Sequence, residues 1–146
     1  MKRILILALL VLLTGTSFAL VDDDRPIAVN QLPQKAQLFI KEHFPKEKVA
    51  YAKIERDFLE VKYEVVFASG SKVEFRKNGD WKEVDCRYTA VPAAIIPSKI
   101  IESVANLYPD NAIVQIDRNR RDYEVKITNG LELTYDLAFN LIEIDD

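Results

Sequence analysis

The chain changes twice from a helix-like to a strand-like pattern of apolar residues. Between Pro33 and Pro45, side chains with an apolar body recur at helical spacing: Ala36, Phe39, Ile40 and His43. After Pro45 the period becomes two, and from Leu59 to Phe67 apolar residues alternate with charged ones. Such alternation is typical of antiparallel strands with one buried and one solvated face. The first pattern therefore predicts one short helix and four strands, with Asn78-Gly79 as the tight turn before the last strand.

The same order of patterns returns sixty-four residues later. Pro97 and Pro109 enclose a second helical stripe, formed by Ile100, Ile101, Val104 and Leu107. The later strands match at an offset of sixty, so we expect the first hairpin of the second unit to be about four residues shorter, a deletion that repeats tolerate. We predict an α+β fold of two αββββ repeats that form an eight-stranded antiparallel sheet, with two helices packed on one face. The expected boundaries are residues 31–87 and 96–146 for the repeats and 88–95 for a linker.

Residues 1–19 have the features of a secretory signal peptide. Lys2 and Arg3 precede an apolar run, and Ser17-Phe18-Ala19 places small residues where a signal peptidase cleaves. The run is about ten residues long, whereas a spanning helix needs roughly 20. An uncleaved membrane anchor is the alternative interpretation. We expect a periplasmic or secreted mature chain without stable membrane insertion, in which residues 20–30 form a solvated lead.

The charge of the mature chain excludes two classes of partner. Cleavage after Ala19 removes Lys2 and Arg3, which lowers the formal net charge from −3 to −5. Nucleic-acid-binding surfaces are basic because they displace counterions from phosphates. Anionic lipid surfaces likewise attract basic segments. We therefore expect no nucleic acid as the partner and no electrostatic adhesion to anionic lipid.

The repeated "LP…FP" helices, the "NGxW" turn and the leader together resemble the PepSY-like family of small exported bacterial proteins. That family is similar in fold to the β-lactamase inhibitor protein, in which two helix-plus-sheet repeats join into one concave antiparallel sheet. The resemblance implies a periplasmic or secreted binding module and assigns no contact residue. The single cysteine of this chain is a departure, since the inhibitor protein has a disulfide in each repeat.

The residues that usually carry catalysis are few. His43 and Cys86 are the single histidine and the single cysteine, too few for a zinc site, and no sequence neighbour suggests a triad around His43. A histidine at a helix end and a buried free thiol are the alternatives to a functional role, although an odd cysteine can also form an intermolecular bridge. The remaining candidates are carboxylates on predicted strands: Glu60, Glu64, Glu74, Glu124 and Glu132. Because they alternate with lysine and threonine on solvated faces, we predict no enzymatic activity and no cofactor or metal.

The solvated face of the predicted sheet is the more informative feature. By strand parity we predict a partner-binding face that comprises Trp81, Glu83, Lys62, Glu74, Leu141 and Lys126. An aromatic residue surrounded by charges is a common interface anchor. The alternative for Trp81 is local packing over the Asn78-Gly79 turn.

These patterns predict an exported, non-enzymatic binding module whose open sheet face takes a protein or a cell-envelope component. Two alternatives remain open: an inhibitor or chaperone of an exported hydrolase, and a small-molecule binder with a pocket between the repeats. The basic stretch from Arg118 to Arg121 is a candidate anion site or a solvated turn.

Overall fold

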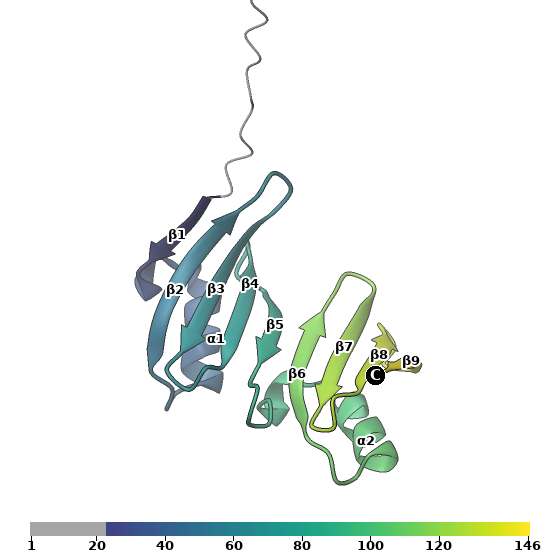
Figure 1. Cartoon of the computed structure of the whole chain (residues 1–146). Coiled ribbons are helices and arrows are strands. Elements are labelled where there is room, and N and C mark those ends of the chain that lie inside the picture. The colour runs from purple at the N-terminus through teal and green to yellow at the C-terminus, as the bar shows by residue number, and fades with distance from the viewer. Residues whose placement is uncertain (1–22) are drawn as a thin grey trace, which may run out of the picture.

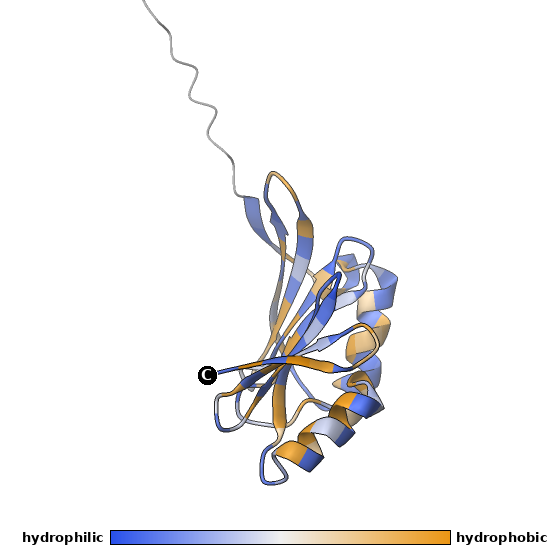
Figure 2. Cartoon of the chain, turned by 90° about the vertical axis from the view of Figure 1, so that its right-hand side faces the viewer, coloured by the Kyte–Doolittle hydropathy of each residue, from blue (hydrophilic) through white to orange (hydrophobic). Residues whose placement is uncertain are grey.

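The computed structural model describes residues 23–146, and the predicted signal peptide lies outside the described residues. Nine strands form one antiparallel sheet in which each strand pairs with its neighbours in the sequence, from β1 to β9 (Figure 1). Two α-helices lie on the same side of this sheet (Figure 2). We call the helix-covered side of the sheet the covered face and the other side the bare face.

The first repeat follows the predicted plan of one helix and four strands, and an additional strand and a short turn of helix precede them. Its elements, including a short 3-10 helix η1, are β1 (Asp23–Ile27), η1 (Val29–Gln31), α1 (Gln34–His43), β2 (Val49–Arg56), β3 (Val61–Phe67), β4 (Lys72–Arg76) and β5 (Trp81–Asp85). The helix begins directly after Pro33. Proline lacks a backbone N–H, and it loses no helical hydrogen bond here because an N–H at the start of a helix has no partner within the helix. It ends before Pro45, which disfavours helical geometry at Phe44.

The second repeat uses the same order of elements after a 3-10 turn in the linker. They are η2 (Ala93–Ile95), α2 (Ser98–Leu107), β6 (Ile113–Arg118), β7 (Asp122–Ile127), β8 (Glu132–Asp136) and β9 (Leu141–Asp145). The pairing of β5 with β6 joins both repeats into one continuous sheet, with Val84 opposite Ile116. Among residues 23–146, no helix has the length and apolar character needed to cross a membrane.

The prediction of eight strands is wrong by one strand. Asp23–Ile27, which we expected to be part of a solvated lead, forms the edge strand β1 and pairs with β2, with Asp24 opposite Glu55. None of its side chains is fully buried, so an apolar pattern could not reveal it. Pro26 is compatible with this position because an edge strand leaves part of its backbone unpaired. In each repeat, the first strand after the helix pairs with a strand that precedes the helix: β2 pairs with β1, and β6 pairs with β5.

The hydrophobic core lies between the covered face and the helices. Ala36 and Ile40 of α1 and Ile100 and Val104 of α2 are buried there. The strands contribute fully buried side chains: Val65, Phe67, Val73, Phe75, Val84, Ile116, Val125, Ile127, Leu133 and Tyr135. The Tyr135 hydroxyl lies 3.0 Å from Ser103 Oγ of α2, which satisfies its polar end inside the core. With the apolar side chains on one side, the charged residues of the same strands are left on the bare face.

Candidate partner-binding face

Cross-strand register brings five carboxylates into one line across the bare face. Glu64 lies opposite Glu74, and Glu74 lies opposite Glu83. Across the repeat boundary, Glu83 lies opposite Asp117, which in turn lies opposite Glu124. We call this set the acidic row: Glu64, Glu74, Glu83, Asp117 and Glu124. It crosses five successive strands, β3 to β7, at the centre of the sheet.

Lysines offset the charge of the row in the first repeat. Lys53 Nζ lies 3.6 Å from a carboxylate oxygen of Glu64, and Lys62 Nζ lies 3.6 Å from one of Glu74. Lys72 Nζ lies 3.5 Å from Glu74 and 3.2 Å from Glu83. The hydrogen bonds that Lys53 donates to Glu55 and Asp24, and the negative charges of Glu64 and Glu55, raise the pKa of Lys53 despite its partial desolvation. This half of the row is therefore a mixed network of both signs.

The other half of the row forms no ion pairs within the described residues. Within residues 23–146, no lysine or arginine forms an ion pair with Asp117 or Glu124. Asp117 accepts a hydrogen bond of 2.9 Å from Gln115 Nε2, and Glu124 accepts one of 3.2 Å from Asn119 Nδ2. Both partners are neutral amides, so the negative charge of these two carboxylates is offset only from a distance, by Lys72 in the case of Asp117.

The pKa values of three carboxylates in the row are raised, first by burial and then by neighbouring negative charges. Burial raises the pKa of Asp117 and the charges of Glu124 and Glu74 raise it further, whereas the hydrogen bond from Gln115 and the charge of Lys72 lower it in part. Burial also raises the pKa of Glu83, with Asp117 and Glu74 adding repulsion that Lys72 only partly offsets. The pKa of Glu124 is raised by burial and by the surrounding acidic groups Asp122, Glu132 and Glu143. The sheet therefore holds carboxylates under mutual repulsion at this position.

Four of the six residues that we predicted for the partner-binding face do lie on the bare face. Glu74 and Glu83 belong to the acidic row, and Lys62 borders it. Lys126 lies opposite Gln115 and forms a 3.1 Å ion pair with Glu132. Whether these side chains contact a partner stays a prediction.

The predicted placement of Trp81 and Leu141 on the bare face is wrong. The register shifts between Glu74 and Phe75, so Phe75 lies opposite Trp81 and both rings are on the covered face. The Trp81 ring lies 6.4 Å from that of Phe39 in α1. The equivalent shift in β8–β9 places Leu141 opposite the buried Tyr135. One extra residue in each last strand reverses the side-chain parity, as β-bulges do.

The sequence contained an unused signal for both bulges. In each last strand, a large apolar residue stands one position out of phase with the apolar residues that follow: Trp81 before Val84, and Leu141 before Ile144. The acidic row itself was missed as a unit because Asp117 joins it only through the pairing of β5 with β6. The register of β5 against β6 depends on how the two repeats pack together, and no pattern in the sequence of either strand reveals it.

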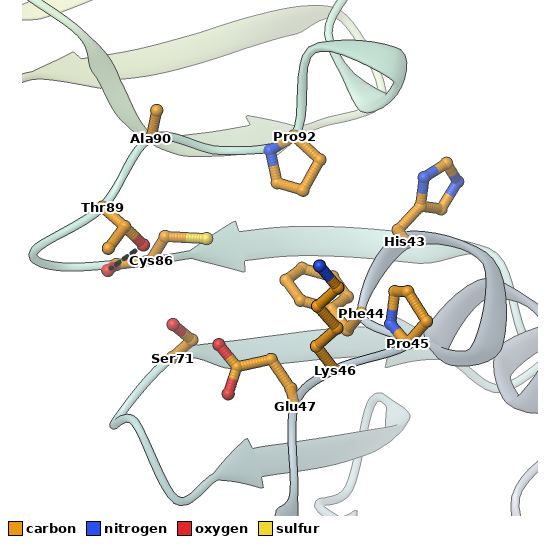
Figure 3. Close-up of a pocket in the computed structure, with 10 residues that line it drawn as sticks. All are labelled: His43, Phe44, Pro45, Lys46, Glu47, Ser71, Cys86, Thr89, Ala90 and Pro92. Carbon is orange, nitrogen blue, oxygen red and sulfur yellow. Dashed lines mark hydrogen bonds between the residues drawn. The ribbon is translucent and has the colours of Figure 1, made fainter.

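A pocket of about 230 Å³ lies beside the end of α1 (Figure 3). It is lined by His43, Phe44, Pro45, Lys46, Glu47, Ser71, Cys86, Thr89, Ala90 and Pro92. All of these residues belong to the first repeat and the linker, so the pocket is not the one expected between the repeats. Cys86 is buried, and burial raises the pKa of its thiol, which favours the unreactive protonated form. The His43 ring packs on Phe39 at 4.6 Å between centroids.

The part of the chain that the structure describes contains no group of side chains suited to a metal ion. Within residues 23–146, no three histidine, cysteine, aspartate or glutamate side chains are grouped so that they could hold one. The carboxylates of the acidic row extend along a line across five strands instead of converging on one point.

Comparison with known proteins gives a family and several solved relatives. A family model described as "Putative beta-lactamase-inhibitor-like, PepSY-like" matches residues 20–62 and again residues 61–143. Among curated proteins, no sequence matches the chain.

Three crystal structures from Bacteroides are similar over most of the chain. A "putative calcium-regulated periplasmic protein" of Bacteroides thetaiotaomicron is 56% identical, with a TM-score of 0.84 over 85% of this chain and 98% of that one. A "putative periplasmic protein from DUF2874 family" of Bacteroides vulgatus is 53% identical, with a TM-score of 0.82 over 86% and 99%. A "putative periplasmic protein of unknown function" of Bacteroides vulgatus is 37% identical, with a TM-score of 0.81 over 85% and 100%. All three are described as periplasmic, in agreement with the exported location that the leader predicts.

Proposed function

We propose, from the premise that this chain belongs to the PepSY-like, beta-lactamase-inhibitor-like family, that it is a periplasmic binding module for a protein partner. The partner presents a cationic segment to the bare face, and this segment lies along the acidic row. Charge complementarity of this kind selects partners and accelerates their association. No chemical step is part of this function.

The observation that carries the proposal is the half of the acidic row, Asp117 and Glu124, in which no carboxylate forms an ion pair within residues 23–146. Like charges directly opposite each other on neighbouring strands destabilise a sheet. The fold does not need them there, because alternation requires only polar side chains on a solvated face. The raised pKa values of Glu83, Asp117 and Glu124 express the unfavourable free energy that the folded chain retains. Partly buried carboxylates with perturbed pKa values are typical of functional sites, and a cationic partner would relieve the repulsion.

Calcium is the second cation to consider, because the relative from Bacteroides thetaiotaomicron is described as calcium-regulated. A calcium site usually takes six to eight oxygen ligands around one point. The described residues offer no group of three convergent ligands, so we favour a lysine- or arginine-rich protein segment. Calcium then acts as a competitor that screens the row.

A narrower alternative is that the partner is an exported hydrolase, which this chain inhibits or protects. The family description favours this alternative. Affinity capture from a periplasmic extract would identify the class of partner. An inhibitor would reduce the activity of a captured hydrolase at equimolar ratio, whereas a carrier or scaffold would not change it.

The test is affinity capture from a periplasmic extract of the native bacterium with the mature chain as bait. The test variant combines Glu83→Gln, Glu124→Gln and Asp117→Asn. The matched control combines Glu42→Gln, Glu102→Gln and Asp110→Asn, which remove the same three charges from exposed positions at the helices. We expect the test variant to lose at least about tenfold of the captured partner and the control to retain it, with weaker capture at high salt. Equal capture by the two variants contradicts the proposal.

A further inference from the structure

The two repeats close their first hairpins with the same turn but with opposite chemistry at the tip. In the first repeat, the N–H of Asp57 donates to the carbonyl of Glu60 at 3.1 Å. In the second repeat, the N–H of Asn119 donates to the carbonyl of Asp122 at 3.0 Å. Both turns thus place two residues between the bonded pair, and these are Phe58-Leu59 in one case and Arg120-Arg121 in the other.

The apolar pair is almost completely exposed. Phe58 is 87% and Leu59 is 88% exposed, the highest values among the exposed large hydrophobic residues. Neither side chain stabilises the fold by burial. Because the second repeat makes the same turn with two arginines, the turn does not require apolar residues at its tip. The pair is therefore unexplained by folding.

The turn holds the pair in a fixed position. Asp57 Oδ1 accepts hydrogen bonds from the backbone N–H groups of Leu59 at 2.8 Å and of Glu60 at 2.7 Å. Such an Asx turn restricts the backbone at the two tip residues. A preorganised tip loses less conformational entropy when it binds.

The hairpin also projects farther than its counterpart. β2 has eight residues and β6 has six, which extends the first hairpin by roughly 7 Å at about 3.4 Å per strand residue. Figure 1 shows the β2–β3 connection reaching beyond the neighbouring strands β4 and β5. The extra length moves Phe58 and Leu59 away from the body of the protein, where they can enter a concave surface.

We propose that Phe58 and Leu59 form an insertion tip that enters an apolar pocket on another exported protein. The carboxylates of Asp57 and Glu60 flank the pair directly. Lys82 Nζ lies 3.5 Å from Glu60 and Arg56 precedes Asp57, so the tip has no excess of positive charge that would attract it to the anionic surface of a bilayer. A protein pocket with donors at its rim accommodates both the apolar pair and its acidic flanks. This surface is separate from the acidic row, and the inference does not depend on the proposed function.

The test is site-specific photo-crosslinking in the native envelope. Benzoylphenylalanine replaces Phe58 in one variant and Arg120, at the equivalent turn, in the other. We expect a protein adduct at position 58 that is absent or at least about fivefold weaker at position 120. The purified adduct partner should then bind the mature chain, and Phe58→Ser with Leu59→Ser should weaken binding at least tenfold. Arg120→Ser with Arg121→Ser should leave binding unchanged.

Three results would overturn the inference. They are equal adducts at positions 58 and 120, an adduct formed with lipid or with a second copy of the chain, and unchanged affinity of the Phe58→Ser, Leu59→Ser variant. Thermal unfolding is the control for folding, and the midpoint should not change because both side chains are exposed. Flotation with vesicles of phosphatidylethanolamine and phosphatidylglycerol distinguishes a lipid target from a protein target.

Discussion

The guanidinium carbon of Arg118 lies 4.5 Å from the centroid of the Trp81 indole ring, across the boundary between the two repeats. Arg118 Nη2 also donates a hydrogen bond of 2.8 Å to the backbone carbonyl of Trp81. Arg76 reinforces the contact by donating to the carbonyls of both Trp81 and Arg118. Through its contacts with Arg118, Trp81 therefore links β5 to β6 on the covered face, and its ring also packs against Phe39 of α1.

Replacement of Trp81 is accordingly expected to reduce stability and to leave the bare face intact. Trp81→Ala removes the contacts with Phe39 and Arg118 and should lower the free energy of unfolding by about 3 kcal/mol. A double-mutant cycle with Arg118→Ala should give a coupling of about 0.5–1 kcal/mol. Urea denaturation measures both quantities. A stable Trp81→Ala protein that fails to bind a partner would show that the indole belongs to the interface after all.

The raised pKa of Asp117 predicts a stability that falls as the pH rises. A carboxyl whose pKa is higher in the folded than in the unfolded chain binds more protons when folded, so its ionisation destabilises the fold. Asp117→Asn should therefore raise the melting temperature at pH 7. The gain should vanish at a pH below the pKa of the unfolded chain, where Asp117 is protonated in both states.

Asp136 provides the control of opposite sign. Hydrogen bonds from the backbone and side chain of Asn140, and from the backbone N–H of Ala138, lower the pKa of Asp136. Its ionised form therefore stabilises the fold above the pKa of the unfolded chain, and this contribution is lost as the pH falls through the lower folded value. Asp136→Asn should lower the melting temperature at pH 7. Shifts of the same sign in the two variants would contradict the electrostatic account.

Two glycines with the same backbone conformation should respond differently to substitution. Gly79 and Gly130 have φ values of +87° and +92°, which disfavour any residue with a Cβ atom. A Cβ at Gly79 would also lie 2.9 Å from Pro33 Cβ, where α1 begins, whereas a Cβ at Gly130 would meet no atom within 4 Å. Gly130→Ala should cost about 1 kcal/mol and Gly79→Ala about 3 kcal/mol in urea denaturation. Equal losses of unfolding free energy in the two variants would show that the contact with the start of α1 does not restrict substitution at Gly79.

Cys86 is predicted to remain a free thiol. It is buried, and burial raises its pKa, so little thiolate forms at neutral pH. A chromogenic disulfide reagent should react with the native protein at least about a hundredfold more slowly than with the urea-unfolded chain. A rapid native reaction, or a disulfide-linked dimer on a non-reducing gel, would contradict this prediction.

Much of the architecture could be predicted from the sequence because prolines and turn residues mark it locally. The helices expected between Pro33 and Pro45 and between Pro97 and Pro109 span Gln34–His43 and Ser98–Leu107. β1 escaped prediction because backbone pairing with β2, not side-chain burial, determines its position. The local sequence pattern is therefore sufficient to predict those helices and strands that bury an apolar stripe.

The candidate site was less predictable because it depends on register. One extra residue in β5 moves Trp81 to the covered face, and alternation alone assigns it to the opposite one. The acidic row exists only because Glu83 and Asp117 lie opposite each other after two repeats combine. Single-strand parity placed Glu74, Glu83, Lys62 and Lys126 on the bare face, as found, but could not align carboxylates from different repeats.

Carboxyl footprinting of the complex tests most directly whether a partner covers the acidic row. A carbodiimide and an amine label exposed carboxylates, and mass spectrometry compares labelling of the free chain with labelling after capture of the partner. We expect protection of Glu83, Asp117 and Glu124 on the bare face, with Glu42 and Glu102 on the helices labelled as in the free chain. Unchanged labelling of the acidic row with protection of the helix carboxylates would contradict the proposal.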